Sequence, residues 1–252
     1  MSALFSLQGK TALVTGASRG LGQAIAMAVA EAGAKVLCAS SAAGGCDATV
    51  QKIQQAGHQA QALSADLSDE SAVRELAAAA QDQGAVDILV NCGGTIFRAP
   101  ADQFPMDEWR KVIAVNLDSA FLLCQLLGRD MIARKSGKII NIASMLSYSG
   151  GITVPAYTAS KHAIAGVTKA LANEWACHNI QVNAIAPGYF RTDNTAALQA
   201  DEARNAAILD RIPAARWGEP EDLTGAAVFL ASAASQYVNG HVLAVDGGWL
   251  AR

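Results

Sequence analysis

A tyrosine and a lysine four residues apart could carry acid–base chemistry. Tyr157 and Lys161 follow Pro155, at the predicted start of a helix. Their spacing places the phenol and the ammonium on one helix face, about one turn apart. A phenol has an unperturbed pKa of about 10, and an adjacent cation favours the phenolate and lowers that pKa. The pair could therefore move a proton at neutral pH, although the spacing alone fits an ordinary exposed Tyr–Lys pair equally well.

Ser144 and Asn116 are two further polar residues at positions where chemistry is possible. Ser144 directly follows a predicted strand over residues 137–143. Its hydroxyl would point into the crevice at the strand end and could hydrogen-bond a carbonyl oxygen that gains charge. Taken alone, a serine or an asparagine at such a position indicates a turn or a cap. Only together with Tyr157 and Lys161 does either residue favour catalysis.

A glycine-rich loop over residues 15–22 follows the first predicted strand and precedes an Ala-rich helix. Gly16 permits a tight turn, Gly20 lets the backbone approach phosphates, and Gly22 permits close helix packing. The helix N-terminus supplies free N–H groups and a positive dipole. This order is typical of a pyrophosphate site, although the loop alone would also fit a simple turn between strand and helix.

Short apolar segments alternate with helix-length amphipathic stretches along the chain. Several are almost continuously hydrophobic, as strands covered by helices on both faces are. The pattern predicts a single α/β domain over residues 1–252, a Rossmann-type, doubly wound, parallel seven-stranded sheet with helices on both faces. Its ligand crevice would lie at the carboxyl ends of the strands. The predicted strands cover residues 10–15, 34–40, 59–65, 86–91, 137–143, 181–186 and 241–245.

Residues 189–217 form a long stretch without a clear strand. The middle of this stretch is charged and rich in alanine, which predicts helix. Long segments of this kind in a compact domain often cover a functional site. We therefore expect a helical flap over the crevice, bounded by Pro213 and Pro220.

The bulk properties argue against several kinds of site. The five cysteines and four histidines show no metal-ligand spacing, so neither a disulfide framework nor a metal is expected. The formal net charge of −3 comes without a basic patch, which argues against nucleic acid or a membrane as partner. No apolar run approaches the roughly 20 residues of a membrane span, and the first residues lack a secretory signal. We expect a cytoplasmic protein that acts on a small molecule.

Taken in order, these motifs resemble those of the short-chain dehydrogenase/reductase family along essentially the whole chain. The resemblance implies a nicotinamide-dependent oxidoreductase that interconverts an alcohol and a ketone, with Asn116, Ser144, Tyr157 and Lys161 as its catalytic residues. Asn116 would sit at a helix bend and hold a water that leads to Lys161. A homotetramer is also implied, with the apolar tail around Trp249 near a subunit contact, unless this tail packs on its own sheet.

The resemblance also implies a set of cofactor residues. The motif Asn91-Cys92-Gly93-Gly94 departs from the family's usual Asn-Asn-Ala-Gly, so the hydrogen bonds of the missing second asparagine must be supplied otherwise. Thr192 would contact the nicotinamide carboxamide. The expected cofactor residues are Gly16, Ser18, Arg19, Gly20, Leu21, Gly22, Ser40, Ser41, Asp66, Leu67, Asn91, Gly93, Gly94, Tyr157, Lys161, Pro187, Gly188, Phe190 and Thr192.

The end of the second strand bears on the choice between NADP(H) and NAD(H). Ser40 and Ser41 stand there, without the acidic residue that commonly binds the ribose of NAD. No carboxylate would repel a 2′-phosphate, and Arg19 could pair with it. The local chemistry therefore favours NADP(H), and NAD(H) remains the alternative.

Stretches of the catalytic half resemble the family's dehydrogenases of sugar acids, such as 2-dehydro-3-deoxy-D-gluconate and 2-deoxy-D-gluconate. Arg98 follows the Asn91 motif and could bind a substrate carboxylate, although a solvated loop arginine is an equal alternative. The expected substrate residues are Arg98, Ser144, Ser147, Tyr157, Tyr189 and Arg216. The alternatives are a 3-oxoacyl carrier-protein reductase, which the glycine loop also resembles, a general carbonyl reductase, and a nucleotide-sensing regulator without turnover.

Overall fold

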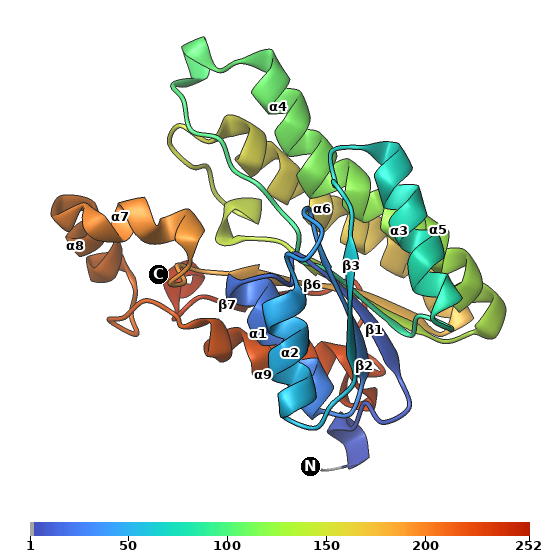
Figure 1. The fold of residues 1–252 in the computed structure, drawn as a ribbon. Coiled ribbons are helices and arrows are strands. Elements are labelled where there is room, and N and C mark those ends of the chain that lie inside the picture. The colour runs from blue at the N-terminus through green and yellow to red at the C-terminus, as the bar shows by residue number, and fades with distance from the viewer. Residues whose placement is uncertain (1–2) are drawn as a thin grey trace.

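The computed structural model describes residues 3–252, which form a seven-stranded parallel sheet between two layers of helices (Figure 1). The strand order is β3-β2-β1-β4-β5-β6-β7. The strands are β1 (Thr11–Thr15), β2 (Lys35–Ser40), β3 (Ala60–Ser64), β4 (Ile88–Asn91), β5 (Gly137–Ile142), β6 (Ile180–Pro187) and β7 (Val242–Val245). The predicted Rossmann-type sheet is confirmed, and the apolar segments mark all seven strands.

The helices lie on both faces of the sheet, as the continuously apolar strands require. On one face lie α1 (Gly20–Glu31), α2 (Asp47–Gln55) and α9 (Thr224–Ala231), and on the other α3 (Glu70–Asp82), α5 (Ser119–Arg134) and α6 (Pro155–Trp175) (Figure 1). Successive residues of a strand point to opposite faces. In β1, Leu13 therefore packs with the second group of helices and Val14 with the first, and both side chains are fully buried.

The strand order reverses between β2 and β4, which both pair with β1. The loops after β1 and β4 therefore lead to helices on opposite faces and leave a ligand crevice between them. These loops also come very close, since a Cβ atom on Gly16 would lie 2.9 Å from the Cα of Gly93. Gly16 has a φ of +67°, so both its conformation and this contact require glycine.

The segment Met106–Arg134 is one continuous helix with an irregular turn in its middle. It consists of α4 (Met106–Ile113), the π-helical turn η3 (Ala114–Asp118) and α5. By length and composition alone this helix could cross a membrane, but here its buried residues Leu123, Leu127 and Met131 pack in the core against the sheet. Asn116 lies in the π-helical turn, where the resemblance places a helix bend.

Residues 189–217 contain the helices that their composition predicts. These are η6 (Asp193–Thr195), α7 (Ala196–Ala200) and α8 (Glu202–Arg211), which stand away from the sheet (Figure 1). That they cover a substrate stays a prediction. The remaining short helical turns are η1 (Ala3–Phe5), η2 (Ala101–Gln103), η4 (Met145–Ser147), η5 (Ala176–His178), η7 (Pro220–Leu223), η8 (Ala233–Ser235) and η9 (Trp249–Ala251).

Candidate active site

Tyr157 and Lys161 lie on the first turns of α6, beside the carboxyl end of β5. Pro155 starts this helix, where its missing N–H costs no hydrogen bond. The Lys161 side chain is buried, and its Nζ donates a hydrogen bond of 2.6 Å to the backbone oxygen of Ile142. The same nitrogen lies 5.5 Å from the centroid of the Tyr157 ring. The structure thus brings the phenol and the ammonium together, as their spacing predicts.

The pKa of Tyr157 shifts in the direction opposite to the one expected from its neighbour. Burial raises this pKa, while a hydrogen bond from Ser144 and the positive charge of Arg98 lower it. The desolvation of the phenolate outweighs both effects. Burial also lowers the pKa of Lys161 to about 8, because an ammonium loses solvation in the same way. The phenol of this structure is therefore protonated at neutral pH and is set up to donate a proton.

Ser144 stands between β5 and the turn η4, which it caps. Its side chain is buried, and its Oγ accepts a hydrogen bond of 3.1 Å from the backbone nitrogen of Leu146. The hydroxyl also bonds to Tyr157, which lowers the pKa of the phenol. Ser144 and Tyr157 can therefore both hydrogen-bond to the same oxygen of a substrate.

Asn116 joins the π-helical turn to α6. Its Nδ2 donates to the oxygen of Thr95 at 2.9 Å and to the Oγ of Ser160 at 3.1 Å, and its Oδ1 accepts from the nitrogen of Thr95 at 2.8 Å. Ser147 also supports α6, because its hydroxyl donates to the backbone oxygen of Lys161. The proton of Ser147 is thus used inside the protein, which does not favour its predicted contact with substrate.

The glycine loop fits a dinucleotide pyrophosphate. A Cβ atom on Gly22 would lie 2.1 Å from the backbone oxygen of Gly16, so only glycine lets the loop close onto the start of α1. The residue at the N-cap of α1, Arg19, makes no side-chain cap, which leaves the first-turn N–H groups available to an anion. Across the crevice, a Cβ on Gly20 would lie 3.5 Å from the Cγ2 of Thr192. The loop therefore faces the segment expected to hold the nicotinamide.

Thr15 holds the backbone of the Asn91 motif. Its Oγ1 accepts from the backbone nitrogens of Cys92 at 3.1 Å and Gly93 at 2.9 Å. A Cβ at position 93, where alanine is usual in the family, would lie 2.4 Å from the Cδ1 of Leu67, so an alanine there would require the Leu67 side chain to move. Thr15 was not among the residues predicted from the sequence, although its place directly before Gly16 was a usable signal.

At the adenosine end, Ser40 and Ser41 lie where β2 stops, and neither position carries an acidic side chain. The Oγ of Ser40 donates to the oxygen of Ala42 at 3.1 Å. Arg19 does not lie free in this structure, since its Nε is 2.8 Å from the Oδ2 of Asp193 in an exposed ion pair. Hydrogen bonds from Ser68 lower the pKa of Asp66, which therefore stays ionised beside the predicted adenine site.

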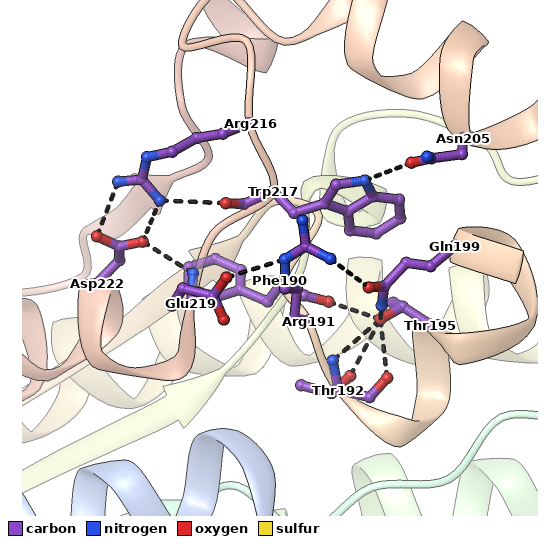
Figure 2. Close-up of polar contacts among 10 residues, drawn as sticks. All are labelled: Phe190, Arg191, Thr192, Thr195, Gln199, Asn205, Arg216, Trp217, Glu219 and Asp222. Carbon is purple, nitrogen blue, oxygen red and sulfur yellow. Dashed lines mark hydrogen bonds and ion pairs between the residues drawn. The ribbon is translucent and has the colours of Figure 1, made fainter.

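Hydrogen bonds and ion pairs tie the flap to the loop before η7 (Figure 2). The Nε of Arg191 lies 2.9 Å from the Oε1 of Glu219, and its Nη1 donates to the Oε1 of Gln199 at 3.0 Å. The indole nitrogen of Trp217 donates to the Oδ1 of Asn205 at 2.7 Å. The segment between β6 and α9 is thus held by side chains from both of its ends.

The structure separates the two arginines that were expected to bind substrate. Arg216 is engaged by the carboxylate of Asp222, with Nη2 2.9 Å from Oδ1, and lines a cavity of about 220 Å³ whose lining does not include Ser144 or Tyr157. Arg98, in contrast, acts on the pKa of Tyr157, and its Nη2 donates to the oxygen of Asn194 in the flap at 3.1 Å. Only Arg98 is therefore connected to the catalytic cluster.

Three aromatic side chains from distant parts of the chain form a wall next to the flap. The ring of Tyr189 lies edge-on to Trp217 and Trp249, with centroid distances of 5.3 Å and 4.9 Å. Met145, next to Ser144, packs in the same apolar cluster. The tail around Trp249 thus packs on the flap of its own chain and not on the sheet, and its position near a subunit contact stays a prediction.

Comparison with known proteins identifies the relatives of this chain. Residues 10–203 match the family model described as short chain dehydrogenase. The chain is 56% identical over 248 residues to 2-dehydro-3-deoxy-D-gluconate 5-dehydrogenase of Bacillus subtilis, a match that covers 98% of this chain and 97% of that protein.

Two solved structures are similar to this chain along almost its whole length. One, from Beutenbergia cavernae, is described as an NAD(P)-dependent gluconate 5-dehydrogenase with bound NADP at low occupancy. It has a TM-score of 0.96 and 52% identity, covering 99% of this chain and 100% of that one. The other, gluconate 5-dehydrogenase of Burkholderia cenocepacia with NADP and tartrate, has a TM-score of 0.95 and 41% identity, covering 99% of this chain and 98% of that one.

Replacing the phenol tests the predicted role of Tyr157. Tyr157→Phe removes the transferable proton and keeps the ring, so turnover should fall by roughly 10²-fold or more while cofactor affinity is retained. Lys161→Met should be at least as damaging, because it removes the buried cation beside the phenol. Steady-state turnover and a fluorescence titration of the cofactor measure both quantities. Turnover near that of the wild type in Tyr157→Phe would refute the assignment.

The hydrogen bond from Ser144 should affect how the rate of alcohol oxidation depends on pH. Oxidation of an alcohol needs the phenolate of Tyr157, so its rate rises as pH increases through the pKa of that group. Ser144 lowers this pKa. Ser144→Ala should therefore move the rise to higher pH, as well as slowing turnover by about 10²-fold. Ser149→Ala, an exposed hydroxyl nearby, is the control. An unchanged midpoint in Ser144→Ala would contradict the proposed bond.

Proposed function

Because the chain belongs to the short-chain dehydrogenase family, we propose that it interconverts a secondary alcohol and a ketone on a sugar acid of the 2-dehydro-3-deoxy-D-gluconate or 2-deoxy-D-gluconate type. The observation that carries this proposal is the cluster of the buried Ser144 and Lys161 with the partly buried Tyr157, where the guanidinium of Arg98 is close enough to act on the phenol. The full-length similarity to sugar-acid dehydrogenases supports the substrate class.

The residues of this cluster divide the proton chemistry among them. A bound nicotinamide supplies or accepts the hydride. In the direction of reduction, Tyr157 donates its proton to the ketone oxygen while Ser144 donates a hydrogen bond to the same oxygen as it gains charge. In the direction of oxidation, the Tyr157 phenolate takes the proton of the alcohol. Lys161 stabilises that phenolate electrostatically, and Asn116 keeps α6 in position through Ser160.

NADP(H) is the favoured cofactor. NADP is bound in the related structures from Beutenbergia cavernae and Burkholderia cenocepacia. In this chain, the end of β2 carries Ser40 and Ser41 in place of an acidic residue, so nothing there repels a 2′-phosphate. Arg19 lies on the neighbouring loop, where its guanidinium could exchange Asp193 for that phosphate.

A carboxylate at the end of β2 should reverse this preference. Ser40→Asp places a negative charge where the 2′-phosphate of NADP would lie, and it offers NAD an acceptor for its free ribose hydroxyl. The ratio of kcat/KM with NADP to kcat/KM with NAD should therefore fall by about tenfold or more. Gln81→Glu, which adds the same charge on an exposed position of α3, is the matched control. If the ratio stays the same in Ser40→Asp, the end of β2 does not discriminate between the cofactors.

Arg98 is the proposed ligand of the substrate carboxylate. A guanidinium offers two parallel donors that match a carboxylate, and Arg98 is the arginine of this chain that acts on the pKa of Tyr157. Its present acceptor is a neutral backbone oxygen, that of Asn194, which an anionic group could replace. The related structure from Burkholderia cenocepacia holds tartrate, a dicarboxylate, which supports an acid as the substrate.

Arg98→Ala should raise KM for sugar acids by a factor equivalent to roughly 1.5–3 kcal/mol and leave neutral ketones nearly unaffected. Arg98→Lys keeps the charge without the two-donor geometry, so its KM for sugar acids should lie between that of the wild type and that of Arg98→Ala. Initial rates with a keto-sugar acid and with a neutral ketone measure the difference. Equal losses for both substrates would mean that Arg98 only supports the flap. Acetoacetyl thioester reduction would then become the activity to test.

We also propose that the protein is a cytoplasmic homotetramer without nucleic-acid or membrane partners. The formal net charge of −3 without a basic patch supports the absence of polyanionic partners. Large apolar side chains at the surface support self-association, among them Phe121 on α5, with 43% of its surface exposed, and Ile152 with 76%.

A further inference from the structure

A second polar cavity lies at the end of the sheet opposite to the catalytic cluster. Its volume is about 160 Å³, and it opens between the amino ends of β1, β4, β5 and β6. Its lining includes the polar residues Lys10, Asp87, Lys138, Asn179, Gln181 and Ser232. None of these residues takes part in the proposed reaction, so this end of the sheet needs its own explanation.

Lys138 and Gln181 lie side by side in this cavity, because they are cross-strand partners in the parallel register of β5 and β6. The Lys138 amine makes a single hydrogen bond within residues 3–252, of 3.3 Å to the Oγ of Ser235. Gln181 is only 5% exposed, yet its side-chain amide has no hydrogen-bond partner in the same part of the chain. An ammonium has three donors and an amide has two, so unused donors line the cavity.

Within residues 3–252, Lys138 makes no ion pair. The Asp87 carboxylate, which lines the same cavity, already accepts a hydrogen bond of 3.0 Å from the nitrogen of Thr11 and pairs with Lys10 and Arg134, both at 3.4 Å. Burial lowers the pKa of Lys138 to about 8, and no acidic group opposes this effect. Both groups are accessible to solvent from the cavity, and an anion that displaces water there could accept hydrogen bonds from both.

We propose that this cavity binds a small oxyanion, a phosphate or a carboxylate, held between the ammonium of Lys138 and the amide of Gln181. Both groups would donate to its oxygens, and hydrogen bonds between opposite charges are the stronger kind. The cavity has room for a group of that size but not for a dinucleotide. The site is separate from the cofactor crevice, so its occupancy stabilises the folded chain without contributing to hydride transfer.

Thermal unfolding of the NADP-saturated protein tests the proposal, because bound NADP already fills the phosphate sites of the glycine loop. Inorganic phosphate, compared with chloride at equal ionic strength and pH 7, should raise Tm by roughly 3–6 °C at ten times its dissociation constant. Acetate, tested in the same way, shows whether a single carboxylate is sufficient. The rise should shrink above pH 8, where the free Lys138 amine loses its proton.

Three variants separate this site from general salt effects. Lys138→Met should abolish the specific rise, Gln181→Met should reduce it, and Lys169→Met, which removes an exposed lysine on α6, should retain it. Isothermal calorimetry with phosphate gives the same comparison directly, and it remains informative if a variant is less stable. The proposal is wrong if neither phosphate nor acetate shifts Tm of the wild type, or if all four proteins shift equally.

Discussion

A buried ammonium must find an acceptor, and in this protein the acceptor of Lys161 is the last carbonyl of β5. That hydrogen bond, from Nζ to the oxygen of Ile142, ties the first turns of α6 to the strand that leads to Ser144. Ser147 bonds back to the carbonyl of Lys161, and Asn116 bonds to Ser160 between the two reacting side chains. The phenol and the serine hydroxyl can meet on one oxygen only because this network holds helix and strand together.

How far the sequence predicts the molecule depends on whether a feature is local. The strands and the glycine loop follow from neighbouring residues, because apolar runs and glycine conformations act over a few positions. The pKa of Tyr157 could not be predicted from its spacing to Lys161, because burial by the whole fold decides it. Other contacts depend on irregular loops, where no periodic sequence pattern indicates which residues meet. Examples are the pairing of Arg216 with Asp222 and the packing of Tyr189 on Trp249.

The flap makes contact with both walls of the crevice through two consecutive residues. Asp193 pairs with Arg19 on the glycine loop, and the carbonyl of Asn194 accepts from Arg98 beside the catalytic cluster. Both contacts are exposed, so solvent and salt weaken them. The firm attachment of the flap is elsewhere, at the buried side chains of Ile208, Trp217 and Trp249. The flap is thus attached by one apolar cluster and by two exposed polar contacts, which solvent can replace more easily.

The π-helical turn at Asn116 has a consequence for the phase of the long helix that contains it. A π turn holds one more residue than an α turn, and each residue rotates the helix face by about 100°. The faces of α4 and α5 are therefore out of step by that angle, and this offset lets Asn116 turn towards Thr95 and Ser160 while Leu123 still faces the sheet. Deleting one residue here would give a regular helix, but the two halves could no longer both face their partners. The π-helical turn therefore lets the two halves of one helix face different parts of the protein.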